Sequence, residues 1–466
     1  MQQSEDRAIR ATRPTTQPRS AFRSGRRARI VTAIAVPALI ALTLLLASGY
    51  RSRRDHRAER DRLAEAASLD RRSRDDQIRV WNVALNMDPV SAVALAQLSA
   101  LNVQKARETG KESFYPIAEE MARRSLALRT RRNTKTYVVL ASALLAQHRF
   151  REARAAAAEA YAAEPEVAQY RALLAEIDME LGDYGAAAQG FTGLGRYATH
   201  LSIGPRLARW EEVNGHSESA RRILQELAAQ ADQRRELPRE QLAWFHFRLG
   251  DHYRRHGSPR RARASFDRAL AVNPGDYRAH KGLAELDMAL GKPKSAARHA
   301  RTAVAASRTP ETLLTLANAL RESGDEPKAV AIEAEVAEAI GADGGSFERA
   351  WHAYRMDWGI AGGELTPLLE RESRERGDVQ GYDLLAWAYY RANRIPEARA
   401  AIAKALRSST SDAGVWYHAG VIAHASGDML RARAYMREAL RLNPQFHARH
   451  AGHARSVVRS LERSSG

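Results

Sequence analysis

Histidine has the clearest potential for chemistry in this sequence, because it binds metals and exchanges protons near neutral pH. Three histidines, His447, His450 and His453, recur every third residue near the C-terminus. On a helix they would drift along one face, where they could hold a metal ion. No acidic or cysteine residue stands beside them in the sequence. We therefore expect a polar face on a terminal helix rather than a metal site.

Catalytic motifs are missing from the sequence. The chain has no cysteine, which excludes disulfides, thiolate zinc sites and cysteine nucleophiles. It also has no phosphate-binding loop, H-E-x-x-H zinc helix, G-x-S-x-G elbow or calcium loop. Acidic residues are plentiful, but on solvated helices they most often pair with arginine one turn away. We predict that the protein is not an enzyme and uses no cofactor.

The net charge of +18 is unevenly distributed. Residues 1–29 carry eight arginines and two acidic residues, residues 30–50 carry no charge, and +12 remains on the rest. A basic body can attract nucleic acid, another anionic polymer or an acidic protein. The alternative is that arginine covers solvated helix faces. We favour the second interpretation and do not expect nucleic acid as a partner.

Residues 30–50 are predicted to form a transmembrane helix. The stretch from Ile30 to Gly49 has twenty uncharged residues, which span about 30 Å as a helix, the thickness of a bilayer core. Arginines flank both ends in similar number, so the positive-inside rule does not decide the orientation. A short basic leader is difficult to export, so we expect the N-terminus inside and the body outside a bacterial cytoplasmic membrane. Cleavage after a signal peptide, and secretion, is the alternative.

The rest of the chain repeats itself with a period of 33–34 residues, and a period of this length indicates a stack of similar units. In the segment 243–276, Leu249, Gly250 and Tyr253 lie on one face of a first helix. Gly257 ends that helix, and Ser258-Pro259 begins a second one. Small and large apolar residues at matching offsets recur in 413–446, where Trp416 stands at the position of His246. We therefore expect His246 to pack structurally.

This pattern resembles the tetratricopeptide repeat. Units with matching residues start at positions 134, 168, 201, 243, 277, 310, 379 and 413, with an insertion around 233–238 and a degenerate unit near 345–378. The resemblance implies an all-α, right-handed superhelical solenoid of about ten or eleven helical hairpins. The domains expected are a disordered basic tail (1–29), the transmembrane helix (30–50), membrane-proximal helices and irregular repeats (51–133), the solenoid (134–446), and a capping helix and tail (447–466).

The resemblance also implies where a partner would bind, because first helices of such repeats line a concave groove. The family's groove positions fall on a basic middle and an aromatic C-terminal portion in this chain. The residues concerned are Arg206, Arg209, Arg248, Arg254, Arg255, Arg278, Lys281, Trp387, Tyr390, Arg391 and Tyr417. Basic side chains on a concave surface can bind carboxylates, and Trp, Tyr and Arg often anchor interfaces. The alternative is that these side chains are solvated or paired internally.

Together these features predict a membrane-anchored scaffold or assembly factor that holds another protein, or an acidic peptide segment, in its groove. The lipid bilayer would be its second partner, through residues 30–50. Binding of nucleic acid or another anionic polymer to the basic surface is the alternative function.

Overall fold

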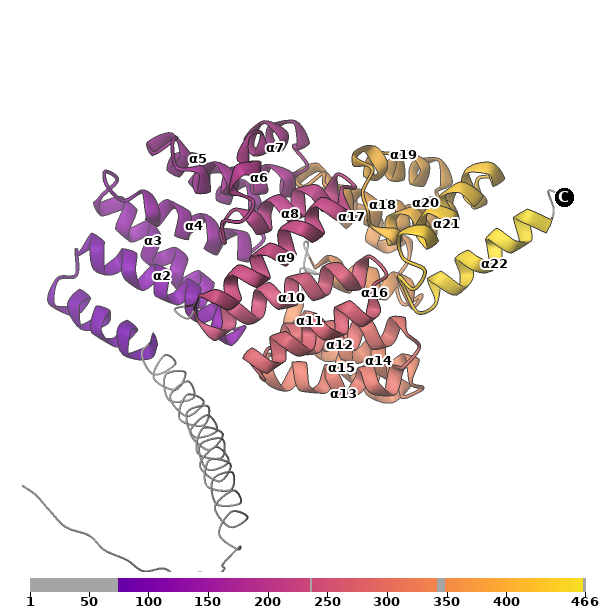
Figure 1. Ribbon diagram of the computed structural model, residues 1–466, viewed down its shortest axis with the longest axis horizontal. Coiled ribbons are helices and arrows are strands. Elements are labelled where there is room, and N and C mark those ends of the chain that lie inside the picture. The colour runs from indigo at the N-terminus through magenta and orange to yellow at the C-terminus, as the bar shows by residue number, and fades with distance from the viewer. Residues whose placement is uncertain (1–73, 235–236, 342–347, 464–466) are drawn as a thin grey trace, which may run out of the picture. The chain divides into compact units, whose positions relative to one another are not determined.

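The computed structural model describes residues 74–234, 237–341 and 348–463, and every regular element in these ranges is a helix (Figure 1). The all-α prediction is therefore confirmed for the described part of the chain. The predicted basic tail (1–29) and transmembrane segment (30–50) lie outside it. None of the helices that the structure describes has both the length and the apolar character needed to cross a membrane.

Residues 74–87 form the first described helix, and the α-helices that follow stand in ten consecutive pairs, which we number as hairpins; the two helices of a pair pack against each other in all of them except α16 and α17, which contact α18 instead. Hairpins 1 to 5 are α2 (Ala92–Thr109) with α3 (Phe114–Leu128), α4 (Thr134–Ala146) with α5 (Phe150–Ala163), α6 (Ala168–Leu181) with α7 (Tyr184–Phe191), α8 (Gly204–Val213) with α9 (Ser217–Gln233), and α10 (Arg239–Arg255) with α11 (Pro259–Val272). Hairpins 6 to 10 are α12 (Tyr277–Ala289) with α13 (Pro293–Ala306), α14 (Pro310–Glu322) with α15 (Glu326–Ile340), α16 (Arg349–Asp357) with α17 (Thr366–Glu375), α18 (Val379–Arg391) with α19 (Ile395–Ala405), and α20 (Ala413–Ala425) with α21 (Met429–Leu442). The helix α22 (His450–Arg463) follows, and short 3₁₀ segments lie at η1 (Leu194–Tyr197), η2 (Gly363–Leu365) and η3 (Leu406–Ser408).

The helix starts follow the sequence period closely. Six first helices, α4, α6, α12, α14, α18 and α20, begin at the residues where the period placed a unit. The helix α8 begins three residues later than its unit, and α10 begins four residues earlier. The insertion predicted around residues 233–238 is explained by two long helices, because α9 and α10 each have 17 residues. The terminal helix begins at His450, after a non-helical segment that includes His447.

Within a hairpin, small residues on the first helix admit a large side chain from the second. Phe266 on α11 is fully buried, and a Cβ added at Gly250 would lie only 2.7 Å from its ring. Gly282 on the next first helix also approaches this ring, and an added Cβ there would lie 2.5 Å from it. In hairpin 10, Gly420 makes the same close approach to Met436. These contacts explain why glycine and a large apolar residue recur at fixed offsets in the sequence.

The turn inside hairpin 5 shows which residues end one helix and begin the next. Gly257 follows α10 with a φ of +67°, a left-handed conformation that glycine adopts without steric cost. Pro259 then occupies the first position of α11, where its missing N–H is not needed. The next unit begins at Asp276, whose carboxylate accepts a hydrogen bond of 3.0 Å from the backbone N–H of Ala279. Local sequence therefore fixes both ends of the unit.

Hairpins that are five units apart also touch, so the stack coils back onto itself. The turn of hairpin 3 contacts the loop after hairpin 8, where the Gly377 N–H donates to the Leu181 carbonyl at 3.1 Å. The turn of hairpin 4 contacts the loop after hairpin 9, where the Ser411 hydroxyl donates to the Glu212 carbonyl at 2.9 Å. The same offset joins hairpin 1 to the loop after hairpin 6, and hairpin 5 to the loop after hairpin 10. We call these the inter-coil contacts.

Candidate functional site

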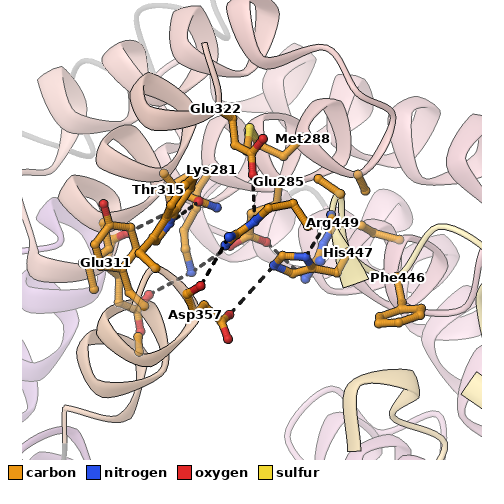
Figure 2. A pocket seen from close by; sticks show the side chains of 18 residues that line it. Lys281, Glu285, Met288, Glu311, Thr315, Glu322, Asp357, Phe446, His447 and Arg449 are labelled. Carbon is orange, nitrogen blue, oxygen red and sulfur yellow. Dashed lines mark hydrogen bonds and ion pairs between the residues drawn. The ribbon is translucent and has the colours of Figure 1, made fainter. Parts of the chain in front are cut away.

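A pocket of ≈ 280 Å³ opens on the inner side of hairpins 5 to 8 (Figure 2). Its walls are first helices of successive hairpins, and the segment between α21 and α22 contributes the remaining side. The lining residues are Arg254, Lys281, Glu285, Met288, Ala289, Glu311, Leu314, Thr315, Asn318, Glu322, Ala350, Tyr354, Asp357, Trp358, Phe446, His447, Ala448 and Arg449. We call this space the inner pocket.

The charges in the inner pocket are paired with one another. The Lys281 ammonium lies 3.0 Å from a Glu311 oxygen and 3.5 Å from a Glu285 oxygen. Burial acts to lower the pKa of Lys281, but these two carboxylates outweigh it and the pKa is raised. Lys281 in turn holds the pKa of Glu311 below its usual range. The Arg254 guanidinium lies 3.1 Å from Glu285. An incoming anion must therefore compete with carboxylates that are already in place.

The inner pocket also offers uncharged contacts. The carbonyl of the Asn318 side chain accepts a hydrogen bond of 3.1 Å from the Trp358 indole. Its amide nitrogen has no acceptor among the described residues, so it can donate to a ligand. Met288 and Phe446 add apolar surface to the pocket (Figure 2). This combination suits a short polypeptide segment, which carries backbone carbonyls and apolar side chains.

The predicted basic middle of the groove is a network of internal ion pairs. Arg255 contacts Glu212 at 2.9 Å and Asp251 at 3.1 Å. Burial would raise the pKa of both carboxylates, but Arg255 and its neighbours outweigh it and both are lowered. The other predicted cations have carboxylate partners as well: Arg206 with Glu176, Arg209 with Glu180, Arg248 with Asp251 and Glu212, Arg254 with Asp251, and Arg278 with Glu240 and Asp276.

This network stands where successive coils meet. A second pocket, of ≈ 310 Å³, is lined by Arg209, Arg248 and Arg255 from one coil and by Asp378, Ser411 and Asp412 from the next. The arginines therefore face the following coil of the same chain. The expected open groove is closed at this place, because the loops after hairpins 8 and 9 lie against it.

The predicted aromatic portion belongs mainly to the core. Trp387 and Tyr417 are only 6% and 4% exposed, and the Trp387 indole donates to an Asp357 carboxylate oxygen at 3.2 Å. Tyr390 is half-buried and stacks on Trp387 with ring centroids 4.9 Å apart. Arg391 alone of the four predicted C-terminal residues is exposed. These rings stabilise the end of the stack and offer little surface to a partner.

The histidines occupy specific environments that the sequence did not reveal. His246 is buried and lies 2.9 Å from an Asp232 oxygen, and His252 is buried 2.7 Å from Glu212. His447 and His450 stack on each other with centroids 4.0 Å apart and face Asp357, which comes from α16. The expectation that these two histidines have no acidic neighbour was therefore wrong. Asp357 is 90 residues away in the sequence, so local spacing gives no signal of it.

The tetratricopeptide repeat model matches residues 138–194, 247–286 and 384–445. These three segments are similar to tetratricopeptide repeats. No curated protein matches the sequence. Solved structures that resemble the repeats include the Cut9–Hcn1 hetero-tetramer of the APC/C (12% identity, TM-score 0.33, covering 84% of this chain and 94% of that one) and yeast Tom70 (14%, 0.33, 78% and 80%). The MamA protein is also similar (14%, 0.23, 44% and 91%).

Proposed function

We propose that this protein is a membrane-anchored scaffold or assembly factor that holds a segment of another protein in the inner pocket. Tetratricopeptide repeats are typical of protein–protein interaction, and the inner pocket is the observation that carries the proposal. It lies on the first helices of several hairpins, so one ligand would contact several repeats at once. The shape and lining of the pocket favour a protein segment over a small charged metabolite.

The charges of the inner pocket define the kind of segment. Because Lys281 and Arg254 already contact Glu285, a strongly acidic peptide would gain little net attraction. Asn318 can bind a backbone or side-chain carbonyl, and Met288 can contact an apolar side chain. We therefore infer an extended segment of mixed charge with at least one apolar residue.

Site-specific crosslinking tests this proposal. A photoreactive amino acid at Thr315 would face the inner pocket, whereas the same group at Thr302 would lie on the exposed surface of α13. In cells of the source organism we expect a discrete protein adduct from position 315 and none from position 302. Identical adducts from both positions, or none from either, would contradict binding in the inner pocket.

The membrane anchor is proposed from residues 30–50 alone, with the N-terminus inside and the solenoid outside. An uncharged stretch of this length inserts stably into a bilayer. If it does, the chain stays in membranes after alkaline carbonate extraction, and externally added protease degrades the repeats in spheroplasts. Recovery of a soluble chain that begins near residue 50 would support the secreted alternative.

A further inference from the structure

Asp357, His447 and His450 bring three potential metal ligands together from separate parts of the stack. Asp357 is the last residue of α16, His447 lies before α22, and His450 is its first residue. The two Asp357 oxygens lie 3.9 Å from the Nε2 atoms of His447 and His450, one each. The three ligand atoms all lie within 4.8 Å of one another. Such a convergence is not needed to close the hairpins, which pack through apolar residues.

The spacing is close to that of a coordination sphere. Zinc holds nitrogen and oxygen ligands at about 2.0 to 2.2 Å, which places neighbouring ligand atoms about 3.4 Å apart in a tetrahedral site. The observed separations are 3.9 Å, each to a different Asp357 oxygen, and at most 4.8 Å among the three ligand atoms, so coordination requires small rotations of all three side chains. Two imidazoles and one carboxylate leave at least one coordination position open.

The Asp357 carboxylate is held in place by a neighbouring side chain. The Trp387 indole donates a hydrogen bond of 3.2 Å to one of its oxygens, in the way that outer-shell donors orient metal ligands.

Two neighbouring cations are already occupied elsewhere. Arg449 lies 3.1 Å from a Glu322 carboxylate oxygen, stacks over the Trp358 ring at 3.9 Å, and donates to the Asp357 backbone carbonyl rather than to its side chain (Figure 2). His418 lies 2.9 Å from an Asp383 oxygen. Each of these groups therefore has a carboxylate partner outside the three proposed ligands.

One hydrogen-bond rearrangement accompanies binding. The Nδ1 atom of His447 accepts long hydrogen bonds from the backbone N–H groups of Arg449, at 3.3 Å, and His450, at 3.4 Å. The proton of the neutral ring therefore sits on Nε2. Coordination through Nε2 moves this proton to Nδ1 and releases these two amides at the start of α22, where solvent can satisfy them.

We propose that Asp357, His447 and His450 bind a divalent transition-metal ion such as Zn²⁺. The ion would join α16 to the start of α22 and so fix the segment that forms one side of the inner pocket. Its open position would lie next to the inner pocket, because Asp357 and His447 also line that space. A carboxylate or imidazole of a bound segment could then complete the coordination.

Metal titration of the full chain in detergent, after treatment with a chelator, tests the proposal. We expect one equivalent of Zn²⁺ with a dissociation constant in the micromolar range, and Co²⁺ should show the visible absorption of a low-coordinate site. The variants Asp357→Asn and His450→Ala should each weaken binding at least tenfold. Asp357→Asn preserves the shape of the side chain, so it keeps the test decisive if His450→Ala unfolds.

His453→Ala is the matched control, because His453 belongs to the same run of histidines but its Nδ1 lies 3.0 Å from the Tyr417 hydroxyl. It should change the affinity by less than about twofold. Absence of Zn²⁺ binding below about 1 mM would overturn the proposal. So would an equal loss in His453→Ala, or a loss in His256→Ala alone, which would place the ion at the cluster of Glu212, His252 and His256.

Discussion

The turns of the early hairpins and the turns of the late hairpins contain the same residue type in different surroundings. Gly182 and Gly215, in hairpins 3 and 4, have positive φ angles, and a Cβ on either would overlap the backbone of the next coil, at Gly377 or Ser409. Gly291 and Gly324, in hairpins 6 and 7, also have positive φ, but nothing lies within 4 Å of an added Cβ. Gly427 in hairpin 10 is open in the same way.

Glycine occupies these turns for two different reasons. In every one of these turns the backbone needs a left-handed residue. Only in the early hairpins must the residue also lack a side chain, because the following coil lies against it. In some units the glycine is needed only for the turn, and in others it is also needed for the contact between coils. The position of the unit in the stack determines which of these two cases applies.

Removal of an inter-coil ion pair should have the largest effect. The Arg376 side chain is buried, donates to the Glu180 carbonyl at 3.0 Å and to its carboxylate, and lies 4.1 Å above the Phe150 ring. Arg376→Ala leaves Glu180 with one cation fewer in a buried place, so we expect a loss of about 3 kcal/mol in the free energy of unfolding. Urea unfolding followed by circular dichroism would measure it.

Arg394→Ala is the matched control for that variant. Arg394 lies within the late hairpin 9 and pairs with the half-exposed Glu370 and Glu397 at 3.3 and 2.9 Å. Because the pair is exposed to solvent, its loss should change the urea midpoint only slightly. Equal destabilisation by both variants would mean that the inter-coil contact contributes no more than an ordinary surface pair.

Alanine substitutions of turn glycines test the comparison directly. Gly182→Ala adds a Cβ that would lie 2.8 Å from the Asp378 backbone nitrogen, and it also strains the left-handed backbone, so we expect a loss of about 3 kcal/mol. Gly324→Ala carries only the backbone strain and should cost about 1 kcal/mol. Urea midpoints of the two variants should differ accordingly, and similar midpoints would remove the distinction between early and late turns.

Acid should lower the stability of hairpins 4 and 5 through Glu212 and Asp251. Burial acts to raise the pKa of Glu212, but Arg255 and His252 outweigh it, so its folded-state pKa lies below the ordinary 4.5. Above pH 4.5 this stabilisation is fully present, and it is lost as the pH falls toward the folded-state pKa, because the unfolded chain takes up protons first. We expect the urea concentration at the unfolding midpoint to decrease as the pH is lowered below about 4.5. In Glu212→Gln this dependence should be smaller, and an unchanged dependence would exclude Glu212 as its source.

The smallest effect is expected at the asparagines that precede the unit-ending prolines. The Asn443 amide donates to the Arg254 and Arg255 carbonyls of hairpin 5 at 3.0 and 3.1 Å. Asn443→Ala should cost about 1 kcal/mol. Asn273 has the same repeat position but makes no side-chain hydrogen bond within the described chain, so Asn273→Ala should cost less than about 0.5 kcal/mol. Thermal melts of the two variants would show whether their order is as expected.

Much of the fold could be predicted from the sequence, because each hairpin is determined by residues that are close together in the chain. Apolar spacing, Gly257 and Ser258-Pro259 lie within one unit and set its helices and turn. The spacing of the units then gives the order of the stack. The coiling of the stack onto itself could not be predicted, since Gly182 and Gly377 are 195 residues apart and neither position departs from an ordinary turn residue.

The candidate site was less predictable for the same reason. The period identified inward-facing arginines, but the carboxylates that neutralise Arg209, Arg255 and Lys281 come from neighbouring units at positions that the repeat leaves free. The sequence also located His447 and His450 without Asp357. A repeat pattern describes how each unit touches the next one, whereas a site combines residues whose partners depend on the curvature of the whole stack.

The inter-coil contacts also determine how the described stack responds to tension. An open coil of helical hairpins lengthens gradually under a pulling force, as a spring does, because only the angle between neighbouring units has to change. Here the hydrogen bond from Gly377 to Leu181 and the ion pair from Arg376 to Glu180 join the coils directly. We expect a stiff response at low force, followed by an abrupt gain in length when these links break.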